Sequence, residues 1–263
     1  MAIRKAVFIT GAASGIGLAA AKRFAREGWF VGLADIDPAG LKAALDAIGR
    51  DRAATYLLDV RDRSAWDDAL SIFTTAAGGR LDVLLNNAGI VAAGNLDVQS
   101  EADIDRQIDV NLKGVINGAR AAIPYLKQTS GAQLVNIASC AGLYGAPGMS
   151  VYAATKFAVR GLSQALEGEL APSGVAVKCI LPWFVETPIL SAAAPGSNQS
   201  LSATLRTGGV KVYTTEDSTS TIWNALRSKR REHIVGAKGK QLAFLVRFFP
   251  GLIRRQALRS RAR

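Results

Sequence analysis

The sequence predicts an α/β fold in which helices cover both faces of a parallel sheet. Seven short, almost uninterrupted apolar runs alternate with longer stretches of helical periodicity. An unbroken apolar run is typical of a strand that is buried on both faces. Strands that alternate with helices form βαβ units, and their right-handed crossovers place helices on both sides of the sheet. The length of 263 residues fits one such domain.

The elements follow from this alternation. The expected strands are Ala6–Thr10, Phe30–Ala34, Ala54–Leu58, Leu81–Asn86, Gln133–Ala138, Ala176–Leu181 and His233–Val235. The expected helices are Gly17–Glu27, Pro38–Ile48, Arg63–Ala77, Ala102–Leu126 and Tyr152–Leu170. Residues 191–220 are rich in Ala, Ser, Thr and Gly, which indicates a flap or loop with some helix. We expect one domain over residues 1–240 and a tail over residues 241–263.

Composition excludes several classes of site. The two cysteines, Cys140 and Cys179, are too few for a disulfide scaffold or a structural zinc cluster. His233 is the one histidine, so a histidine metal cluster is impossible and we expect no metal site. The first residues, MAIRKAVFIT, lack the apolar core and cleavage site of a signal peptide. The sequence therefore predicts a cytoplasmic protein with reduced thiols.

The net charge of +11 is concentrated at one end of the chain. Residues 227–263 carry 12 Lys and Arg and one acid, Glu232, whereas residues 1–226 carry 20 of each sign. The high isoelectric point therefore describes the tail and says little about the chemistry of the neutral body.

A glycine-rich turn, Thr10-Gly11-Ala12-Ala13-Ser14-Gly15-Ile16-Gly17, lies between the first strand and the first helix. Glycines there allow a tight turn, close approach to a pyrophosphate and close packing of helix on strand, while the helix N-terminus supplies free N–H groups. This pattern predicts a dinucleotide site that uses Gly11, Ser14, Gly15, Ile16 and Gly17. The alternative is an ordinary glycine-rich turn. A nucleoside-triphosphate P-loop is excluded because no Gly-Lys-Ser/Thr is present.

An acidic residue, Asp35, ends the second expected strand, 18 residues after Gly17. A carboxylate in this place accepts hydrogen bonds from an adenosine ribose and repels a 2′-phosphate. The neighbouring Ser14 and Ile36 bring no positive charge, so the sequence predicts NAD as the cofactor. The alternative role for Asp35 is to cap the following turn.

Three residues of catalytic type follow the fifth expected strand. Ser139 ends that strand, and Tyr152 and Lys156 lie 13 and 17 residues beyond it, one helical turn apart on one face. A phenol is a poor base at neutral pH, and a nearby ammonium is expected to move its pKa towards the working pH. Ser139 can then bond the substrate oxygen as charge develops on it. Each residue alone is more often structural, and it is their order behind a dinucleotide turn that favours catalysis.

Taken together, these motifs resemble those of the classical short-chain dehydrogenase/reductase family. The resemblance covers about residues 4–236. It rests on Thr10–Gly17, Asp59-Val60, Asn86-Asn87-Ala88-Gly89, Asn111, Ser139 and Tyr152-x-x-x-Lys156. It implies a single Rossmann-like domain with a seven-stranded parallel sheet and hydride exchange between a nicotinamide dinucleotide and an alcohol or carbonyl. It also implies a homodimer or homotetramer.

The resemblance assigns further residues to the cofactor. It implies that Asp59 and Val60 hold the adenine and that Asn87, Ala88 and Gly89 line the centre of the cofactor site. It implies that Asn111 holds a water in a proton relay through Lys156, which with Tyr152 also contacts the nicotinamide ribose. The last implied positions, which place the carboxamide, are Pro182, Val185 and Thr187.

One position departs from the family pattern. Pro-Gly usually follows the sixth strand, and here the pair is Pro182-Trp183. Either the Trp183 ring lies beside the nicotinamide site, or the backbone there suits any residue and the ring points outward.

The loops expected around the substrate are apolar. Candidate contacts besides Ser139 are Leu143, Tyr144, Met149, Trp183 and Phe184. No Lys or Arg occurs in residues 140–150 or 183–205, so an anchor for a carboxylate or phosphate is not expected. The sequence favours a small lipophilic alcohol or ketone as the substrate.

The tail combines an apolar run, Gln241–Ile253, with five arginines beyond it. The run is shorter than the ~20 residues that span a bilayer. It suits either peripheral contact with a membrane or packing over the substrate site or a subunit neighbour. Nucleic acid is not expected, because no aromatic–basic interleaving is present. The alternative functions are a nucleotide-binding protein without catalysis and a membrane-surface protein on the same fold.

Overall fold

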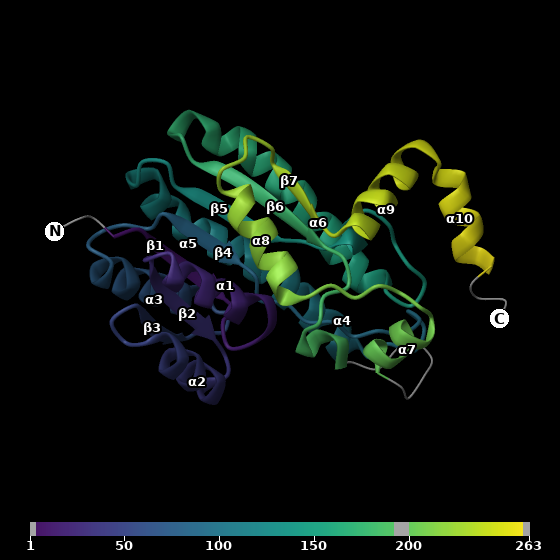
Figure 1. Ribbon diagram of the computed structural model, residues 1–263, viewed down its shortest axis with the longest axis horizontal. Helices are drawn as coiled ribbons and strands as arrows, with labels where there is room; N and C mark the ends of the chain where they lie inside the picture. Colours follow the sequence, from purple (N-terminus) through teal and green to yellow (C-terminus); the bar gives the residue numbers. More distant parts are fainter. Residues whose placement is uncertain (1–3, 192–199, 260–263) are drawn as a thin grey trace.

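The computed structural model describes residues 4–191 and 200–259, and its centre is a seven-stranded parallel sheet between two helical layers (Figure 1). The strands are β1 (Ala6–Thr10), β2 (Phe30–Asp35), β3 (Ala53–Leu57), β4 (Val83–Asn86), β5 (Gln133–Ile137), β6 (Ala176–Pro182) and β7 (Glu232–Val235). Their order across the sheet is β3-β2-β1-β4-β5-β6-β7. The predicted doubly wound parallel sheet is confirmed. The order reverses between β1 and β4, and ligands of such sheets bind outside the carboxyl ends of the strands at that point.

Helices cover both faces of the sheet. They are α1 (Gly15–Arg26), α2 (Pro38–Ile48), α3 (Arg63–Ala76), α4 (Glu101–Ile108), α5 (Gly114–Gln128), α6 (Ser150–Leu170), α7 (Leu201–Thr207), α8 (Thr215–Ala225), α9 (Ala237–Phe248) and α10 (Pro250–Arg259). Alternate strand residues face opposite sides. Val7 and Ile9 therefore pack with α1, α2 and α8, whereas Phe8 packs with α3, α5 and α6. Each side of the sheet carries its own hydrophobic core.

Side-chain caps explain where several helices begin. Asp37, Asp62, Ser100 and Thr214 each accept a hydrogen bond from a backbone N–H in the first turn of α2, α3, α4 and α8. Helix α1 is different: its N-cap residue, Ser14, makes no side-chain cap bond, and no acid stands in the first turn. The N-terminus of α1 thus keeps N–H donors and a positive dipole end for another partner.

The single helix expected over 102–126 is three elements in the structure. A π-helical turn, Asp109–Lys113, separates α4 from α5, and the N–H of Gly114 bonds Asp109 O across it. Such turns insert one residue into a helix and are frequent at functional sites. This one contains Asn111. Apolar periodicity predicts the whole stretch as helical but carries no signal for the inserted residue.

The segment expected as a flap contains ordered structure on both sides of residues 192–199, which lie outside the described part of the chain. Beyond them come the short helix α7 and an extended piece that pairs with the strand end after β6. There Tyr213 N bonds Phe184 O, and Glu186 N bonds Tyr213 O. This pairing fixes the chain that follows β6.

The apolar run of the tail is divided between two helices. Helix α9 begins at Ala237, before the expected boundary at residue 240, and ends at Phe248, two residues before Pro250, which begins α10. Proline has no N–H and cannot continue a helix, so the chain turns there. In Figure 1 the two helices stand at one end of the molecule, with α10 away from the sheet. The division into a domain and a tail stays a prediction.

Candidate active site

The glycine-rich turn at the end of β1 is folded as tightly as its sequence suggests. Gly11 has a φ of 66° and Gly15 a φ of 53°, a region that L side chains rarely adopt. A Cβ on Gly17 would lie 2.0 Å from Gly11 O. The turn therefore needs glycine at all three positions, and it brings the start of α1 directly over the end of β1.

A second loop, after β4, is fastened to this turn. The Thr10 hydroxyl accepts hydrogen bonds from the N–H groups of Asn87 and Ala88, both at 3.0 Å. The Asn87 amide donates to Thr10 O at 2.9 Å. The predicted cofactor residues Asn87 and Ala88 thus lie beside Gly11, at the point where the strand order reverses.

The residues present fit a dinucleotide. The uncapped N-terminus of α1 offers donors for a pyrophosphate, and the Asp35 carboxylate stands at the carboxyl end of β2, next to the same turn. Asp35 Oδ2 accepts from Ala13 N at 3.0 Å and Oδ1 accepts from Asp37 N at 3.1 Å. A carboxylate accepts about four hydrogen bonds, so two positions stay open for ribose hydroxyls. The cap of α2 is Asp37 rather than Asp35.

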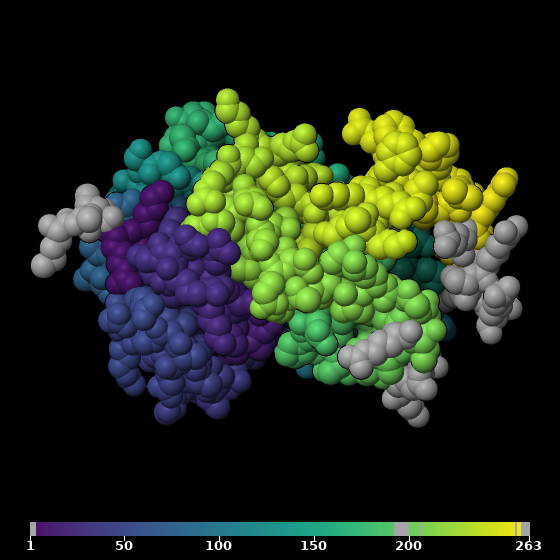
Figure 2. All heavy atoms as spheres, viewed as in Figure 1, coloured from purple at the N-terminus to yellow at the C-terminus, as the bar shows by residue number. Residues whose placement is uncertain are grey.

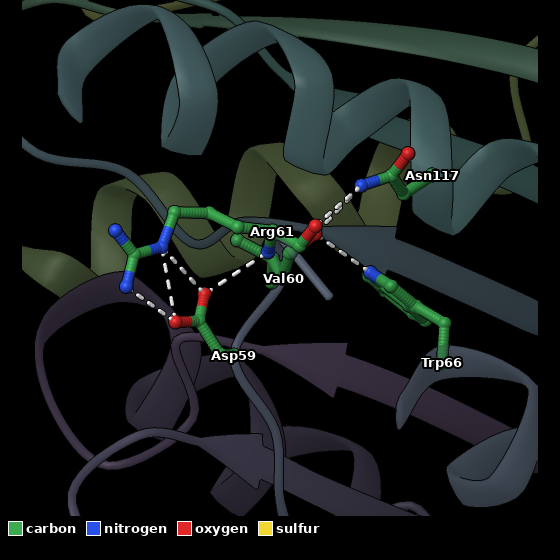
Figure 3. A network of polar contacts seen from close by, with 5 residues as sticks. All are labelled: Asp59, Val60, Arg61, Trp66 and Asn117. Atoms are coloured by element: carbon green, nitrogen blue, oxygen red, sulfur yellow. Dashed lines mark hydrogen bonds and ion pairs between the residues drawn. The ribbon is translucent and has the colours of Figure 1, made fainter. Parts of the chain in front are cut away.

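Asp59 and Val60, the expected adenine residues, follow β3. Figure 3 shows the Arg61 side chain lying across the Asp59 carboxylate, with Nη2–Oδ2 at 2.6 Å and Nε–Oδ1 at 3.0 Å. This contact lowers the pKa of Asp59, although burial opposes it. Val60 is fixed through its carbonyl, which accepts from Trp66 Nε1 at 3.0 Å and Asn117 Nδ2 at 3.1 Å. The Asp59 carboxylate is therefore already engaged, a contact that the resemblance did not imply.

The remaining expected cofactor residues lie at both ends of this region. Ile36 is 68% exposed beside Asp35. Thr187 lies against the glycine-rich turn, since a Cβ on Gly15 would be 3.2 Å from Thr187 Cγ2. Pro182 ends β6, and Val185 is buried and bridges to Tyr213. The segment after β6 thus reaches across to the pyrophosphate end of the site.

Ser139 and Tyr152 meet at the carboxyl end of β5. Ser139 precedes a 3-10 turn, Cys140–Gly142, and its hydroxyl accepts from Ala141 N at 3.1 Å. Tyr152 lies in the first turn of α6, which packs on that turn. The Ser139 side chain is close enough to the Tyr152 hydroxyl to lower its pKa. Two hydroxyls therefore converge where a substrate oxygen would have to bind.

Lys156 reaches the same place from one turn further along α6. It is 4% exposed, its Nζ donates to Ile137 O at 3.1 Å, and Nζ lies 5.7 Å from the centre of the Tyr152 ring. A Cβ on Gly89 would lie 3.5 Å from Lys156 Nζ and 3.2 Å from Asn111 Oδ1. Lys156, Asn111 and Gly89 thus surround one small space.

The Asn111 side chain is occupied by the loop after β4. Its Oδ1 accepts from Ile90 N at 2.8 Å, and its Nδ2 donates to Ile90 O at 2.9 Å and to Thr155 Oγ1 at 3.4 Å. Both amide hydrogens are therefore used. Asn111 fastens the π-helical turn to this loop, and a role in holding water, as the resemblance implies, stays a prediction.

Burial shifts the pKa values of both titratable groups towards their neutral forms. Burial raises the pKa of Tyr152, and the effect of the nearby Ser139 side chain only partly offsets this rise. Burial also lowers the pKa of Lys156 to about 8. The direction for Tyr152 is opposite to the one expected from a neighbouring ammonium. The reason is that Lys156 Nζ bonds a backbone carbonyl and stands off the phenol ring, so loss of solvation outweighs its charge.

The Trp183 ring has defined partners within the protein, and its place relative to the nicotinamide stays a prediction. Its indole Nε1 donates to Lys211 O at 3.1 Å, and the ring packs against an apolar cluster that includes Cys140, Leu143 and Leu181. No described non-glycine residue has a positive φ, so the backbone at Trp183 accepts a side chain without strain. Of the other substrate candidates, Leu143 is buried, and Tyr144, Met149 and Phe184 are partly exposed.

Several residues that hold the site together carry no recognisable signal in the sequence. Thr155 is buried and joins Tyr152 O to the Asn111 amide, and the Ile137 carbonyl orients Lys156. Arg61 donates hydrogen bonds to the Asp59 carboxylate. Each acts through a contact between distant segments or through the backbone, which residue spacing does not reveal.

Comparisons with known proteins agree with this geometry. Residues 5–198 match the family model for short chain dehydrogenases. The chain is 39% identical over 191 residues to the 3-oxoacyl-(acyl-carrier-protein) reductase FabG of Thermotoga maritima, a match that covers 70% of this chain and 76% of that protein. It is 38% identical over 196 residues to the oxidoreductase UcpA of Escherichia coli, with 74% of each covered.

A solved structure is similar over almost the whole chain. A short chain dehydrogenase/reductase from Burkholderia phymatum, in complex with NAD, has a TM-score of 0.84 and 28% identity, with 95% of each chain covered. The family match spans the glycine-rich turn, the Ser139–Lys156 cluster and the segment after β6. The chain belongs to the short-chain dehydrogenase/reductase family and is an oxidoreductase whose cofactor is a nicotinamide dinucleotide.

Proposed function

We propose that this oxidoreductase uses NAD(H) to interconvert a lipophilic secondary alcohol and its ketone, with Tyr152 as the general acid and base. The observation that carries the proposal is the meeting of Ser139, Tyr152 and Lys156 beside Gly89, at the carboxyl edge of the sheet. Bound nicotinamide supplies or accepts the hydride.

The residues of the chain handle the proton. In ketone reduction the Tyr152 hydroxyl donates a proton to the carbonyl oxygen, and the Ser139 hydroxyl bonds the same oxygen as negative charge grows on it. In alcohol oxidation the Tyr152 oxygen takes the hydroxyl proton back. Because burial raises the pKa of Tyr152, the phenol is protonated at neutral pH and ready to act as the acid. The Lys156 ammonium, 5.7 Å from the centre of the ring, stabilises the phenolate once it forms.

The preference for NAD rests on Asp35. Its carboxylate ends β2 and is tied to the glycine-rich turn through Ala13 N. A 2′-phosphate at the ribose would stand against this negative charge, whereas the ribose hydroxyls of NAD can donate to it.

The preference for a lipophilic substrate rests on the side chains near Ser139. Leu143 and Trp183 pack in one apolar cluster, and the rings of Trp183 and Phe184 are 5.2 Å apart. Tyr144 and Met149 follow Leu143 in the same partly exposed loop. Residues 140–150 and 183–205 hold no Lys or Arg. A charged substrate would lose its hydration there without gaining a partner.

A series of secondary alcohols, from butan-2-ol to decan-2-ol, tests this proposal on the wild-type enzyme with NAD. Each methylene that the protein buries contributes about 0.8 kcal/mol, or roughly fourfold in kcat/KM. We expect kcat/KM to rise along the series. A flat or falling series, or a sugar or hydroxy acid that outperforms every alcohol, would show that the site is not a hydrophobic one.

A further inference from the structure

The outer side of the C-terminal helices carries an exposed apolar surface. Phe244, Phe248, Phe249 and Leu252, which we call the aromatic patch, are each more than half exposed. The Phe244 ring lies 4.9 Å from the Phe248 ring and 6.1 Å from the Phe249 ring. Three phenylalanines thus form one contiguous surface at the junction of α9 and α10. Contiguous patches of this kind mark interaction sites.

The body holds α9 from its other side. A Cβ on Gly239 would lie 2.8 Å from Cys140 Sγ, and Leu242 and Ala243 pack on the cluster that contains Leu143 and Trp183. The packed side of α9 and its aromatic side are therefore different. Figures 1 and 2 show the segment that carries the aromatic patch, in yellow, at one end of the molecule.

Positive charge surrounds the aromatic patch. Residues 237–263 contain eight Lys and Arg and no acid. Lys240, Arg247, Arg254 and Arg255 are exposed on the same two helices, and the Arg247 guanidinium lies 5.6 Å from the centre of the Phe248 ring. Residues 1–226 are neutral overall. An anionic partner would therefore be drawn to this end of the molecule.

We propose that the aromatic patch and its basic fringe dock the enzyme onto an anionic membrane surface. Aromatic and leucine side chains of an interfacial helix enter the boundary between headgroups and acyl chains, while Lys and Arg contact anionic headgroups. Within the described residues, no helix is long and apolar enough to cross a bilayer. Docking requires only the surface of α9 and α10 and does not depend on the proposed reaction.

Sedimentation of the full-length protein with vesicles tests the docking without an activity assay. We expect the protein to sediment with vesicles of phosphatidylcholine and phosphatidylserine and to stay in solution with phosphatidylcholine alone. Added salt should release it, because the Debye length falls to about 8 Å at physiological ionic strength and to about 3 Å at 1 M. The first variant, Arg247→Gln with Arg254→Gln and Arg255→Gln, should weaken binding on the order of 100-fold, because each basic residue near such a surface contributes about 1 kcal/mol.

The second variant, Phe244→Ser with Phe248→Ser, removes the centre of the aromatic patch and should weaken binding by about tenfold or more. The matched controls are Leu57→Ser with Ile72→Ser, which are exposed apolar residues of the body, and Lys22→Gln with Lys127→Gln. Both controls should bind like the wild type. Circular dichroism verifies that every variant is folded.

Three results would overturn the proposal. The first is that the protein sediments equally with neutral and anionic vesicles, or that it sediments with neither. The second is a change of oligomeric state in the Phe244→Ser, Phe248→Ser variant with unchanged sedimentation, which would make the aromatic patch a subunit interface. The third is binding to double-stranded DNA in place of vesicles, lost in the arginine variant and kept in the phenylalanine variant.

Discussion

The Asp35 carboxylate combines two roles at one position. It closes the glycine-rich turn by accepting from Ala13 N, and it leaves acceptor positions at the carboxyl end of β2. These roles can be separated by mutation, because the turn is also held by Thr10 and Asn87.

For Asp35→Ala we expect the preference for NAD over NADP to narrow, since the charge that opposes a 2′-phosphate is gone. The measurement is kcat/KM with each cofactor at a fixed substrate. The matched control is Asp46→Ala, an exposed acid paired with Lys42 on α2, which should keep the wild-type ratio. A wild-type enzyme that uses NADP as well as NAD would refute the role given to Asp35.

The burial of Lys156 makes the free energy of unfolding rise with pH in the alkaline range. Its pKa is lowered to about 8, from a value of 10.5 for an exposed lysine. Below about pH 8 the folded and unfolded chains both carry the ammonium, and the folded chain bears the full cost of burying it. Between these two pH values the folded chain has lost the proton that the unfolded chain still holds, so the free energy of unfolding rises with pH.

In Lys156→Met this contribution is absent. The free energy of unfolding of the wild type, minus that of the variant, should grow by about 1.4 kcal/mol per pH unit in the window above pH 8. Urea denaturation at several pH values measures it, with the exposed Lys22→Met as the control that shows no such growth. If this difference in free energy of unfolding stays constant with pH, the pKa of Lys156 is not lowered in the folded protein, contrary to this account.

At this scale the sequence points to residues of catalytic type more readily than to the contacts between them. The spacing of Ser139, Tyr152 and Lys156 is enough to suggest their meeting, because a strand end and a single helix turn have fixed geometry. The ion pair between Asp59 and Arg61 and the hydrogen bonds between Asn111 and Ile90 could not be predicted in this way. They depend on rotamers and on loops from distant parts of the chain.

The elements were predictable wherever periodicity alone defines them. Strand β1 and helix α2 have the expected bounds, whereas β3 runs from Ala53 to Leu57, one residue earlier than expected. That shift leaves Leu57 69% exposed and Leu58 buried just beyond the strand. The apolar character of both leucines gave no means of choosing between the two registers. The π-helical turn at Asn111 was beyond prediction for a related reason, since one inserted residue leaves helical periodicity almost unchanged.

For the whole molecule, strand number, strand direction and the layers followed from the alternation of apolar runs and helices. The sequence does not show which surfaces stay open. Ile116 on α5 and Phe157 on α6 are partly exposed apolar residues. A groove of about 550 Å³ on α6 is lined by residues that include Leu96, Pro147 and Phe157.

We expect the protein to be a homodimer or homotetramer, with the outer faces of α5 and α6 in the interface. Phe157→Arg would place a charge in that apolar contact and should shift the protein towards smaller species in light scattering at micromolar concentration. The matched control is Ile72→Arg, an exposed apolar position on α3, which should leave the mass unchanged. A wild-type monomer at this concentration would contradict the expectation.

The most direct test of the central claim, that Tyr152 moves the proton in a cofactor-dependent oxidoreductase, is the turnover of Tyr152→Phe. This variant keeps the ring and loses the hydroxyl near Ser139. We predict that NAD still binds, as measured by fluorescence titration, while kcat falls by about 10²–10⁴-fold. The control Tyr125→Phe, on α5, should turn over like the wild type. A Tyr152→Phe enzyme that retains more than about a tenth of the wild-type kcat would contradict the account, because general acid–base catalysis by Tyr152 requires a larger loss.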